Sequence, residues 1–168
     1  ALNAELTGEV ATEILEIFTE VIIAPYVTEE AKKVLMEKKN LRVLETGGLP
    51  NPRMMENSIR RIAGGFLLQD GDTGKVEEEN LQIVTERHPN DRELKDLLIA
   101  YRIAKHVKSN AIVYVKDGAS VGIGAGQMSR VDASRIAASK AKDASRALGL
   151  EKSISIGSVV ASDAFFPF

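Results

Sequence analysis

Apolar residues recur at helical spacing in four stretches of the chain and form short runs between them. In the first stretch, Val10, Ile14 and Phe18 fall on one helical face, and Thr7 is placed to cap that helix. The pattern predicts helices at residues 7–20, 28–35, 90–106 and 129–149. It predicts strands at residues 21–24, 41–44, 62–68, 111–115, 120–125 and 159–161.

The order of these elements indicates an α/β fold. The strand–helix–strand order at residues 21–44 favours a parallel pair of strands, because a helical crossover returns the chain in the same direction. Asp117-Gly118 lies between two strand-like runs and predicts a tight hairpin. Because no long linker divides the sequence, we expect a single domain at residues 1–168.

Small residues mark the last predicted helix. Its apolar stripe consists of Ala137, Ala141, Ala144 and Leu148, and small side chains let a helix lie close to a sheet. Ser129 followed three residues later by Asp132 predicts a capping box at the start of this helix.

The composition excludes several classes of protein. Lysine and arginine total 22 and aspartate and glutamate total 24, a net charge of -2, so nothing attracts a long polyanion such as DNA. The sequence holds no cysteine, no apolar run of membrane-spanning length and no leader pattern. We therefore expect a cytoplasmic protein without nucleic-acid or membrane partners.

The two ends of the sequence are unusual. It opens at Ala1 rather than methionine, and three of its five phenylalanines lie among its last four residues. Natural termini are usually polar and frayed, whereas aromatic clusters belong in a core or a ligand pocket. We therefore expect a fragment of a longer protein.

A glycine-rich turn is the first candidate for chemistry. Gly122, Gly124 and Gly126 lie between a predicted strand and a predicted helix, where bare backbone N–H groups and a helix start favour an anion. The spacing matches neither the dinucleotide fingerprint nor the phosphate loop of NTPases. Two interpretations stay open: an anion site, or a strand whose glycines permit close packing.

Two polar residues are further candidates. Arg130 follows the glycine turn at the first helical position, where its guanidinium can donate a fork of hydrogen bonds to an anion; the alternative is a solvated surface arginine. Asn110 precedes a strand, where its amide can bind a heterocycle or a ribose; the alternative is a helix C-cap.

Other candidates are weaker. Lys105 and His106 resemble a catalytic pair, but adjacent helical residues diverge by about 100°, so both cannot easily point into one pocket. We expect both histidines, His88 and His106, to be structural or exposed. The acidic stretch at residues 69–72 lacks the later glutamate of a calcium loop and predicts a plain turn. Ser162 and Asp163 form either a turn or a site.

Three strings taken together resemble one family. KSNAIVY at residues 108–114, GIGAGQMSR at 122–130 and SDAFFPF at 162–168 are similar, in order and spacing, to the transformylase region of the bacterial AICAR transformylase/IMP cyclohydrolase family. KKNLRVLE at residues 38–45 resembles the same family, so the likeness covers nearly the whole chain.

The resemblance implies formyl transfer from 10-formyltetrahydrofolate, as co-substrate, to the 5-amino group of AICAR in IMP biosynthesis. It implies a cytidine-deaminase-like fold, a mixed sheet flanked by helices without zinc, and a homodimer. With the glycine turn, the substrate-binding set is Asn110, Arg130, Gly124, Gly126, Gln127 and Phe165. The resemblance assigns Val131, Pro167 and Phe168 to the folate pocket. It assigns Ser109 and Asp163 to a monovalent-cation site, for potassium.

The sequence also departs from the family. The family's proton-shuttling Lys-His pair lies upstream of Ala1, and the cyclohydrolase domain is absent, so no catalytic residue is assigned here. Neither asparagine nor arginine is a base near neutral pH. We expect the chain alone to bind nucleotide weakly at most and not to turn over. The alternatives are a non-catalytic folding and dimerisation module, and a nucleoside-deaminase relative, which would need zinc ligands that the sequence lacks.

Overall fold

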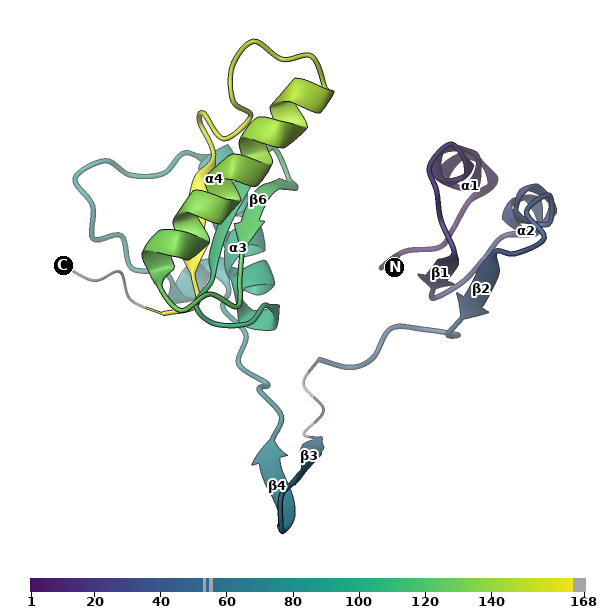
Figure 1. Ribbon diagram of the computed structural model, residues 1–168, viewed down its shortest axis with the longest axis horizontal. Helices are drawn as coiled ribbons and strands as arrows, with labels where there is room; N and C mark the ends of the chain where they lie inside the picture. Colours follow the sequence, from purple (N-terminus) through teal and green to yellow (C-terminus); the bar gives the residue numbers. More distant parts are fainter. Residues whose placement is uncertain (53, 55, 165–168) are drawn as a thin grey trace. The chain divides into compact units, whose positions relative to one another are not determined.

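The computed structural model describes residues 1–52, 54 and 56–164 of the chain, and these divide between two units, Ala1–Thr73 and Gly74–Phe168 (Figure 1). Both units combine helices with small sheets, which confirms the predicted α/β class. The described strands form three separate sheets, each wholly parallel or wholly antiparallel, rather than one mixed sheet. None of the helices among the described residues is long and apolar enough to cross a membrane.

The first unit opens with a strand–helix–strand motif. Helix α1 (Gly8–Leu15) precedes strand β1 (Val21–Ala24), helix α2 (Glu29–Leu35) and strand β2 (Arg42–Glu45). Strands β1 and β2 are parallel, as predicted. Threonine side chains cap both helices by accepting from backbone N–H groups three residues on. The core of this motif consists of Leu6, Ala11, Ile22, Ala24, Val27, Ala31 and Leu35.

Helix α1 is shorter than predicted. It ends at Leu15 instead of near Glu20, and Ile17 and Phe18 are 67% and 90% exposed. A short helix depends on burial of its apolar face, so residues without a packing partner do not extend it.

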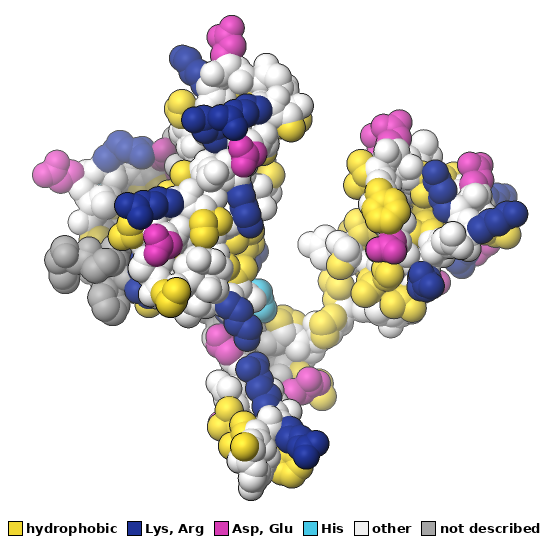
Figure 2. Space-filling model, viewed as in Figure 1, with side chains coloured by type: hydrophobic (Ala, Val, Ile, Leu, Met, Phe, Trp, Pro, Cys, Tyr) yellow, Lys and Arg dark blue, Asp and Glu magenta, His cyan; other side chains and the backbone are white. Residues whose placement is uncertain are grey.

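The predicted single strand at residues 62–68 is wrong. The chain instead forms a hairpin of strands β3 (Asn57–Ile62) and β4 (Gly65–Asp70), and Gly64 turns between them with φ of +82°. The backbone N–H of Gly71 donates to the carbonyl of Glu56, so the acidic stretch continues the hairpin rather than forming a plain turn. Apolar and basic side chains cover the exposed hairpin surface (Figure 2).

The second unit is built on a three-stranded antiparallel sheet in the order β6-β5-β7. A 3-10 turn (Glu78–Asn80) and helix α3 (Asp91–His106) precede strands β5 (Ile112–Lys116) and β6 (Ala119–Gly124), and helix α4 (Arg130–Ala147) leads to β7 (Val159–Ser162). Side chains alternate across β5: Val113 and Val115 pack with α3, and Ile112 packs with α4. The helices therefore cover opposite faces of the sheet (Figure 1).

The predicted hairpin at Asp117-Gly118 is confirmed. Both residues have positive φ, 51° and 78°, as a two-residue turn between right-twisted strands requires. The predicted stripe on α4 is only partly correct, because the helix ends at Ala147. Ala137 and Ala141 are buried, whereas Leu148 is 66% exposed and Ser145 takes the buried position in the last turn.

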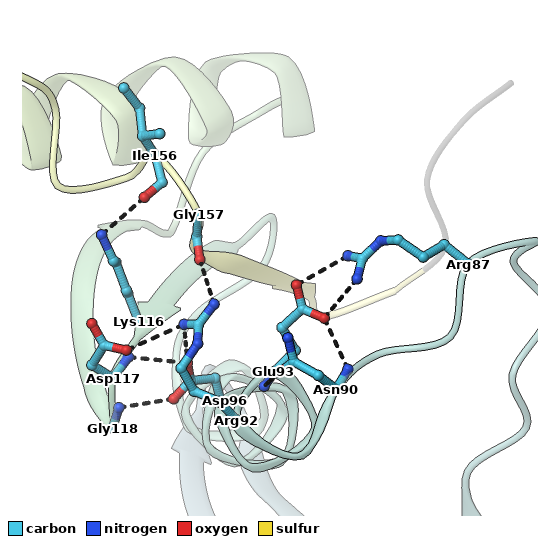
Figure 3. A network of polar contacts seen from close by, with 10 residues as sticks. All are labelled: Arg87, Asn90, Arg92, Glu93, Asp96, Lys116, Asp117, Gly118, Ile156 and Gly157. Atoms are coloured by element: carbon cyan, nitrogen blue, oxygen red, sulfur yellow. Dashed lines mark hydrogen bonds and ion pairs between the residues drawn. The ribbon is translucent and has the colours of Figure 1, made fainter.

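A buried carboxylate that the sequence pattern did not reveal holds the hairpin turn to α3 (Figure 3). Asp96 is 1% exposed and accepts from the backbone N–H groups of Asp117 and Gly118 at 3.0 and 2.8 Å. Arg92 donates to Asp96 at 3.1 Å and to the carbonyl of Gly157 at 3.2 Å. One ion pair thereby joins α3, the β5–β6 turn and the segment before β7.

The start of α3 carries a second polar network (Figure 3). Asn90 and Glu93 form a reciprocal capping box, and Arg87 donates two hydrogen bonds to Glu93. The hydrogen bonds from Arg87, and then the one from the Asn90 backbone, lower the pKa of Glu93 to about 2. Asn90, the first residue of the predicted range, is therefore the N-cap of α3.

Candidate functional site

One end of the three-stranded sheet gathers most of the candidate polar residues. Antiparallel pairing places Ile112, at the start of β5, beside Gly124 at the end of β6 and Ser162 at the end of β7. The connections that meet there are residues 107–111, residues 125–129 and the segment after Ser162. This end of the sheet, where β5 begins and β6 and β7 end, is the candidate site, and it is called the sheet edge below.

Asp163 is the hub of the site. Its carboxylate accepts from the Ser109 hydroxyl at 2.5 Å and from the backbone N–H of Ala111 at 2.8 Å, and the Arg130 guanidinium lies 3.8 Å away. The Ser109 hydrogen bond, the Ala111 hydrogen bond and the Arg130 charge lower the pKa of Asp163, against the opposing effect of burial. The site therefore holds a carboxylate that stays ionised at neutral pH.

Arg130 is the first residue of α4, as predicted, directly after the capping residue Ser129. Its Nε donates to the Ser162 hydroxyl at 3.2 Å, and its side chain is 18% exposed. A cation at a helix N-terminus opposes the helix dipole, and the nearby carboxylate of Asp163 offsets that cost. The guanidinium is thus held at the sheet edge rather than extended into solvent as a surface arginine.

Asn110 and Gln127 join two of the loops at this edge. The backbone N–H and the side-chain amide of Asn110 both donate to the carbonyl of Gln127, at 3.0 and 2.9 Å. The backbone N–H of Gly126 donates to the carbonyl of Lys108 at 2.7 Å. Because the amide nitrogen of Asn110 is bound within the protein, its Oδ1 is the atom suited to accept a hydrogen bond from a ligand.

The three glycines were interpreted either as an anion site or as positions of close packing, and the structure distinguishes Gly122 and Gly124 from Gly126. Gly122 and Gly124 lie inside β6, where an added Cβ would overlap the backbone carbonyls of Ala137 and Ala133 on α4. The close-packing interpretation is therefore confirmed for these two. Gly126 lies in the following loop with φ of +67°, a backbone conformation that glycine adopts without strain.

The predicted capping box on α4 is half formed. The Ser129 hydroxyl accepts from the backbone N–H of Asp132 at 3.1 Å, as expected. The Asp132 carboxylate, however, accepts from the Ser129 hydroxyl at 2.7 Å and takes no part in a reciprocal box. An aspartate is one methylene shorter than the glutamate that normally reaches back to the capping residue.

The remaining candidates are not part of this hydrogen-bonded cluster, and some of them lie outside the described residues. Val131 is 54% exposed at the start of α4, beside Arg130. Phe165, Pro167 and Phe168 lie outside the described residues. Lys105 donates to the carbonyl of Gly74, and His106 at the end of α3 is exposed, as expected.

Among the described residues, no three histidine, cysteine, aspartate or glutamate side chains cluster as metal ligands. Ser162, which the sequence left open with Asp163 as either a turn or a site, accepts a hydrogen bond from Arg130 through its hydroxyl.

Comparison with known proteins adds the family. The model of the AICARFT/IMPCHase bienzyme family matches residues 1–140. The chain is 59% identical, over all of its 168 residues, to the Bifunctional purine biosynthesis protein PurH of Paracoccus denitrificans, of which it covers 32%. It is 60% identical to the protein of that name from Brucella anthropi and 56% identical to that from Agrobacterium fabrum, again over its full length and over 31% of each. The chain thus spans about a third of the length of these relatives, and it belongs to the AICARFT/IMPCHase bienzyme family.

Proposed function

We propose that the chain forms part of an AICAR formyltransferase, which transfers a formyl group from 10-formyltetrahydrofolate to the 5-amino group of AICAR in IMP biosynthesis. Family membership and the relatives named for purine biosynthesis support the reaction class. The observation that carries the proposal is the convergence of Asn110, Arg130 and Asp163 at one edge of a sheet, from three separate parts of the sequence.

These residues suit the recognition of an aminoimidazole nucleotide. Arg130 offers a cation with a planar fork of N–H donors for an anionic or carbonyl oxygen. Asn110 Oδ1 can accept from an amine or a carboxamide, and the exposed backbone of Gly126 lies in the loop between them. Asp163 fixes the Arg130 guanidinium and the Ser109 hydroxyl in place.

The chemistry of the transfer explains why the chain alone should be inactive. The amine of AICAR is a poor nucleophile, because its lone pair is conjugated with the ring and the carboxamide. Attack on the formyl carbon therefore needs a general base and stabilisation of the tetrahedral oxyanion. Arg130 and Asn110 can position the nucleotide, but neither accepts a proton at neutral pH. We expect the base to come from sequence that this chain does not contain.

The remaining assignments are part of the same proposal. Val131, Pro167 and Phe168 would line the folate pocket, and Phe165 the nucleotide pocket. Ser109 and Asp163 would hold a potassium ion, since they present the oxygen donors that hard cations prefer and none of the nitrogen or sulfur donors typical of zinc. A cytidine-deaminase-like fold, a homodimer and a cytoplasmic location complete the proposal.

Calorimetry with AICAR tests the site. The chain should release a small heat of binding that Arg130→Ala abolishes and Arg130→Lys weakens, since lysine keeps the charge and loses the fork. Arg135→Ala is the control, because Arg135 lies on the same helix with its side chain 76% exposed. Equal heats from the Arg130→Ala and Arg135→Ala chains, both folded by circular dichroism, would remove the site and favour a non-catalytic module.

A formyltransferase assay tests the second half of the proposal. The purified chain should give no turnover with AICAR and 10-formyltetrahydrofolate. The intact Paracoccus denitrificans relative serves as the positive control. Turnover by the chain at the rate of that relative would show that it carries its own base and would overturn our assignment.

A further inference from the structure

Two neighbours act on the Arg130 guanidinium in different ways. The Ser162 hydroxyl accepts a hydrogen bond from Nε at 3.2 Å, whereas Oδ2 of Asp163 lies 3.8 Å from Nη2, beyond hydrogen-bonding distance. An ion pair at that distance attracts the charge but sets no angle, because the Coulomb energy depends on the separation alone. A hydrogen bond sets both a distance and an angle. Ser162 therefore gives the guanidinium plane a direction that the Asp163 charge does not give.

The carboxylate of Asp163 has closer partners than Arg130. Its Oδ2 accepts from the Ser109 hydroxyl at 2.5 Å, and its Oδ1 accepts from the backbone N–H of Ala111 at 2.8 Å. Both partners lie in the connection that leads into β5, so they orient the carboxylate toward that connection. Asp163 thus supplies a fixed negative charge near Arg130, and the orientation of the guanidinium depends on Ser162.

The sheet holds Ser162 in place. This serine is the last residue of β7, and it pairs in register with Ile112 of β5. A single side-chain torsion separates its backbone from its hydroxyl oxygen, so a fixed backbone leaves that oxygen few positions. Arg130 has a long side chain with several torsions and needs an anchor to keep one orientation. The hydrogen bond therefore ties a flexible side chain of α4 to a rigid point of the sheet.

The same hydrogen bond decides which side of the guanidinium faces β7. Nε donates to Ser162, and Nη2 forms the ion pair with Asp163, so these two nitrogens face the end of the strand. A guanidinium can bind a pair of oxygens through Nε and one terminal nitrogen, or end-on through its two terminal nitrogens. Because Nε is directed at Ser162, the end-on fork is the one suited to a ligand at this site.

We propose that Ser162 is a positioning residue of the nucleotide site: by holding Nε, its hydroxyl aims the end-on fork of Arg130 at an oxygen of the aminoimidazole nucleotide. The inference rests on the proposed function, because that function gives Arg130 its contact with the nucleotide. Ser162 acts through Arg130 and supplies no charge of its own. Without the hydroxyl, Asp163 still attracts the cation to the sheet edge, but the direction of the guanidinium plane is no longer set.

The hydrogen bond can be tested without the nucleotide. Isotope-edited NMR of arginine side chains observes the Nε–H of Arg130 at slightly acid pH, where guanidinium protons exchange slowly with water. Ser162→Ala should make this proton exchange several-fold faster and shift its resonance, because water replaces the hydroxyl oxygen. Ser162→Thr should leave both near their original values, since threonine keeps the hydroxyl and suits a strand. An Nε–H that Ser162→Ala leaves unchanged would overturn the proposal.

A titration with AICAR tests the consequence for binding. The dissociation constant is measured from amide NMR shifts for the original chain and for each folded variant. Ser162→Ala should weaken binding about two- to tenfold, the contribution of a single hydrogen bond. Ser162→Thr should restore the original affinity. Ser139→Ala is the matched control, because Ser139 is an exposed serine on the same helix as Arg130, and it should leave the affinity unchanged.

The results separate this inference from the proposed function. If the original chain does not bind AICAR at all, the proposed function fails, and the Nε–H measurement alone decides whether Ser162 orients Arg130. If AICAR binds and Ser162→Ala has no more effect than Ser139→Ala, the positioning role fails while the site stands. Equal weakening by Ser162→Ala and Ser162→Thr would also overturn the positioning role, because the effect would then come from packing and not from the hydroxyl.

Discussion

Replacing Asp96 with alanine should destabilise the second unit more than any exposed aspartate does. The side chain is 2% exposed and accepts three hydrogen bonds, from the backbone N–H groups of Asp117 and Gly118 and from Arg92. These are the bonds that hold the β5–β6 turn to α3 (Figure 3). Without the carboxylate, all three donors must find water in a partly buried setting.

The magnitude follows from the kind of bond. A hydrogen bond to a charged group contributes about 1.5–3 kcal/mol net, but these three share one side chain and are not additive. The turn is exposed and Arg92 is 41% exposed, so water recovers part of the loss. We therefore expect Asp96→Ala to cost about 3–4 kcal/mol, the lower part of the range for breaking a buried ion pair. Asp96→Asn should cost about half as much, because one amide oxygen can still accept.

Denaturant unfolding followed by hydrogen-exchange mass spectrometry measures the effect, since it reports peptides of the second unit separately. Asp143→Ala on α4 is the matched control: this aspartate is 63% exposed and pairs with Arg146 on the same helix, so its loss should cost less than about 0.5 kcal/mol. If Asp96→Ala costs no more than Asp143→Ala, Asp96 does not hold the turn to α3 and the reasoning is wrong.

Two further predictions concern the sheet edge. Gly124→Ala should cost about 1–3 kcal/mol, because the new methyl group would overlap a backbone carbonyl of α4, whereas Gly65→Ala, with no atom within 4 Å of its added Cβ, should be nearly neutral in thermal unfolding; similar costs would contradict close packing. Ser109→Ala should raise the pKa of Asp163 toward its ordinary value in a carbon-detected NMR titration. Because the folded-state pKa of Asp163 is lowered, its stabilising effect is complete above the unfolded-state pKa and disappears as pH falls through the folded-state pKa. Ser109→Ala should therefore shift this loss to higher pH, and an unchanged titration would refute the role given to the hydroxyl.

Local signals predicted the elements whose structure is set locally. The parallel pair, the Thr7 cap and the Asp117-Gly118 turn all depend on residues close in sequence. The β3–β4 hairpin was missed because its first strand, Asn57–Ile62, is polar and fully exposed and shows no alternation. Periodicity reports burial, so a strand without a buried face leaves no periodic trace.

The sequence predicted which residues belong to the candidate site, but not which of them contact one another. Ser109 and Ala111 meet Asp163 across more than fifty positions of sequence, and only the register of β5 with β7 brings them together. The importance of Asp96 was hidden for a different reason. An aspartate four residues after Arg92 is typical of an exposed ion pair on a helix, and its burial arises from the hairpin turn that folds over it.

The central claim is that the edge formed by Asn110, Arg130 and Asp163 binds the nucleotide. Amide NMR of the isotope-labelled chain, titrated with AICAR to millimolar concentration, tests it directly and detects weak binding. The account predicts shifts confined to residues 109–111, 125–131 and 162–164, and their disappearance in Arg130→Ala. Shifts that centre on other residues, or that survive in a folded Arg130→Ala chain, would contradict it.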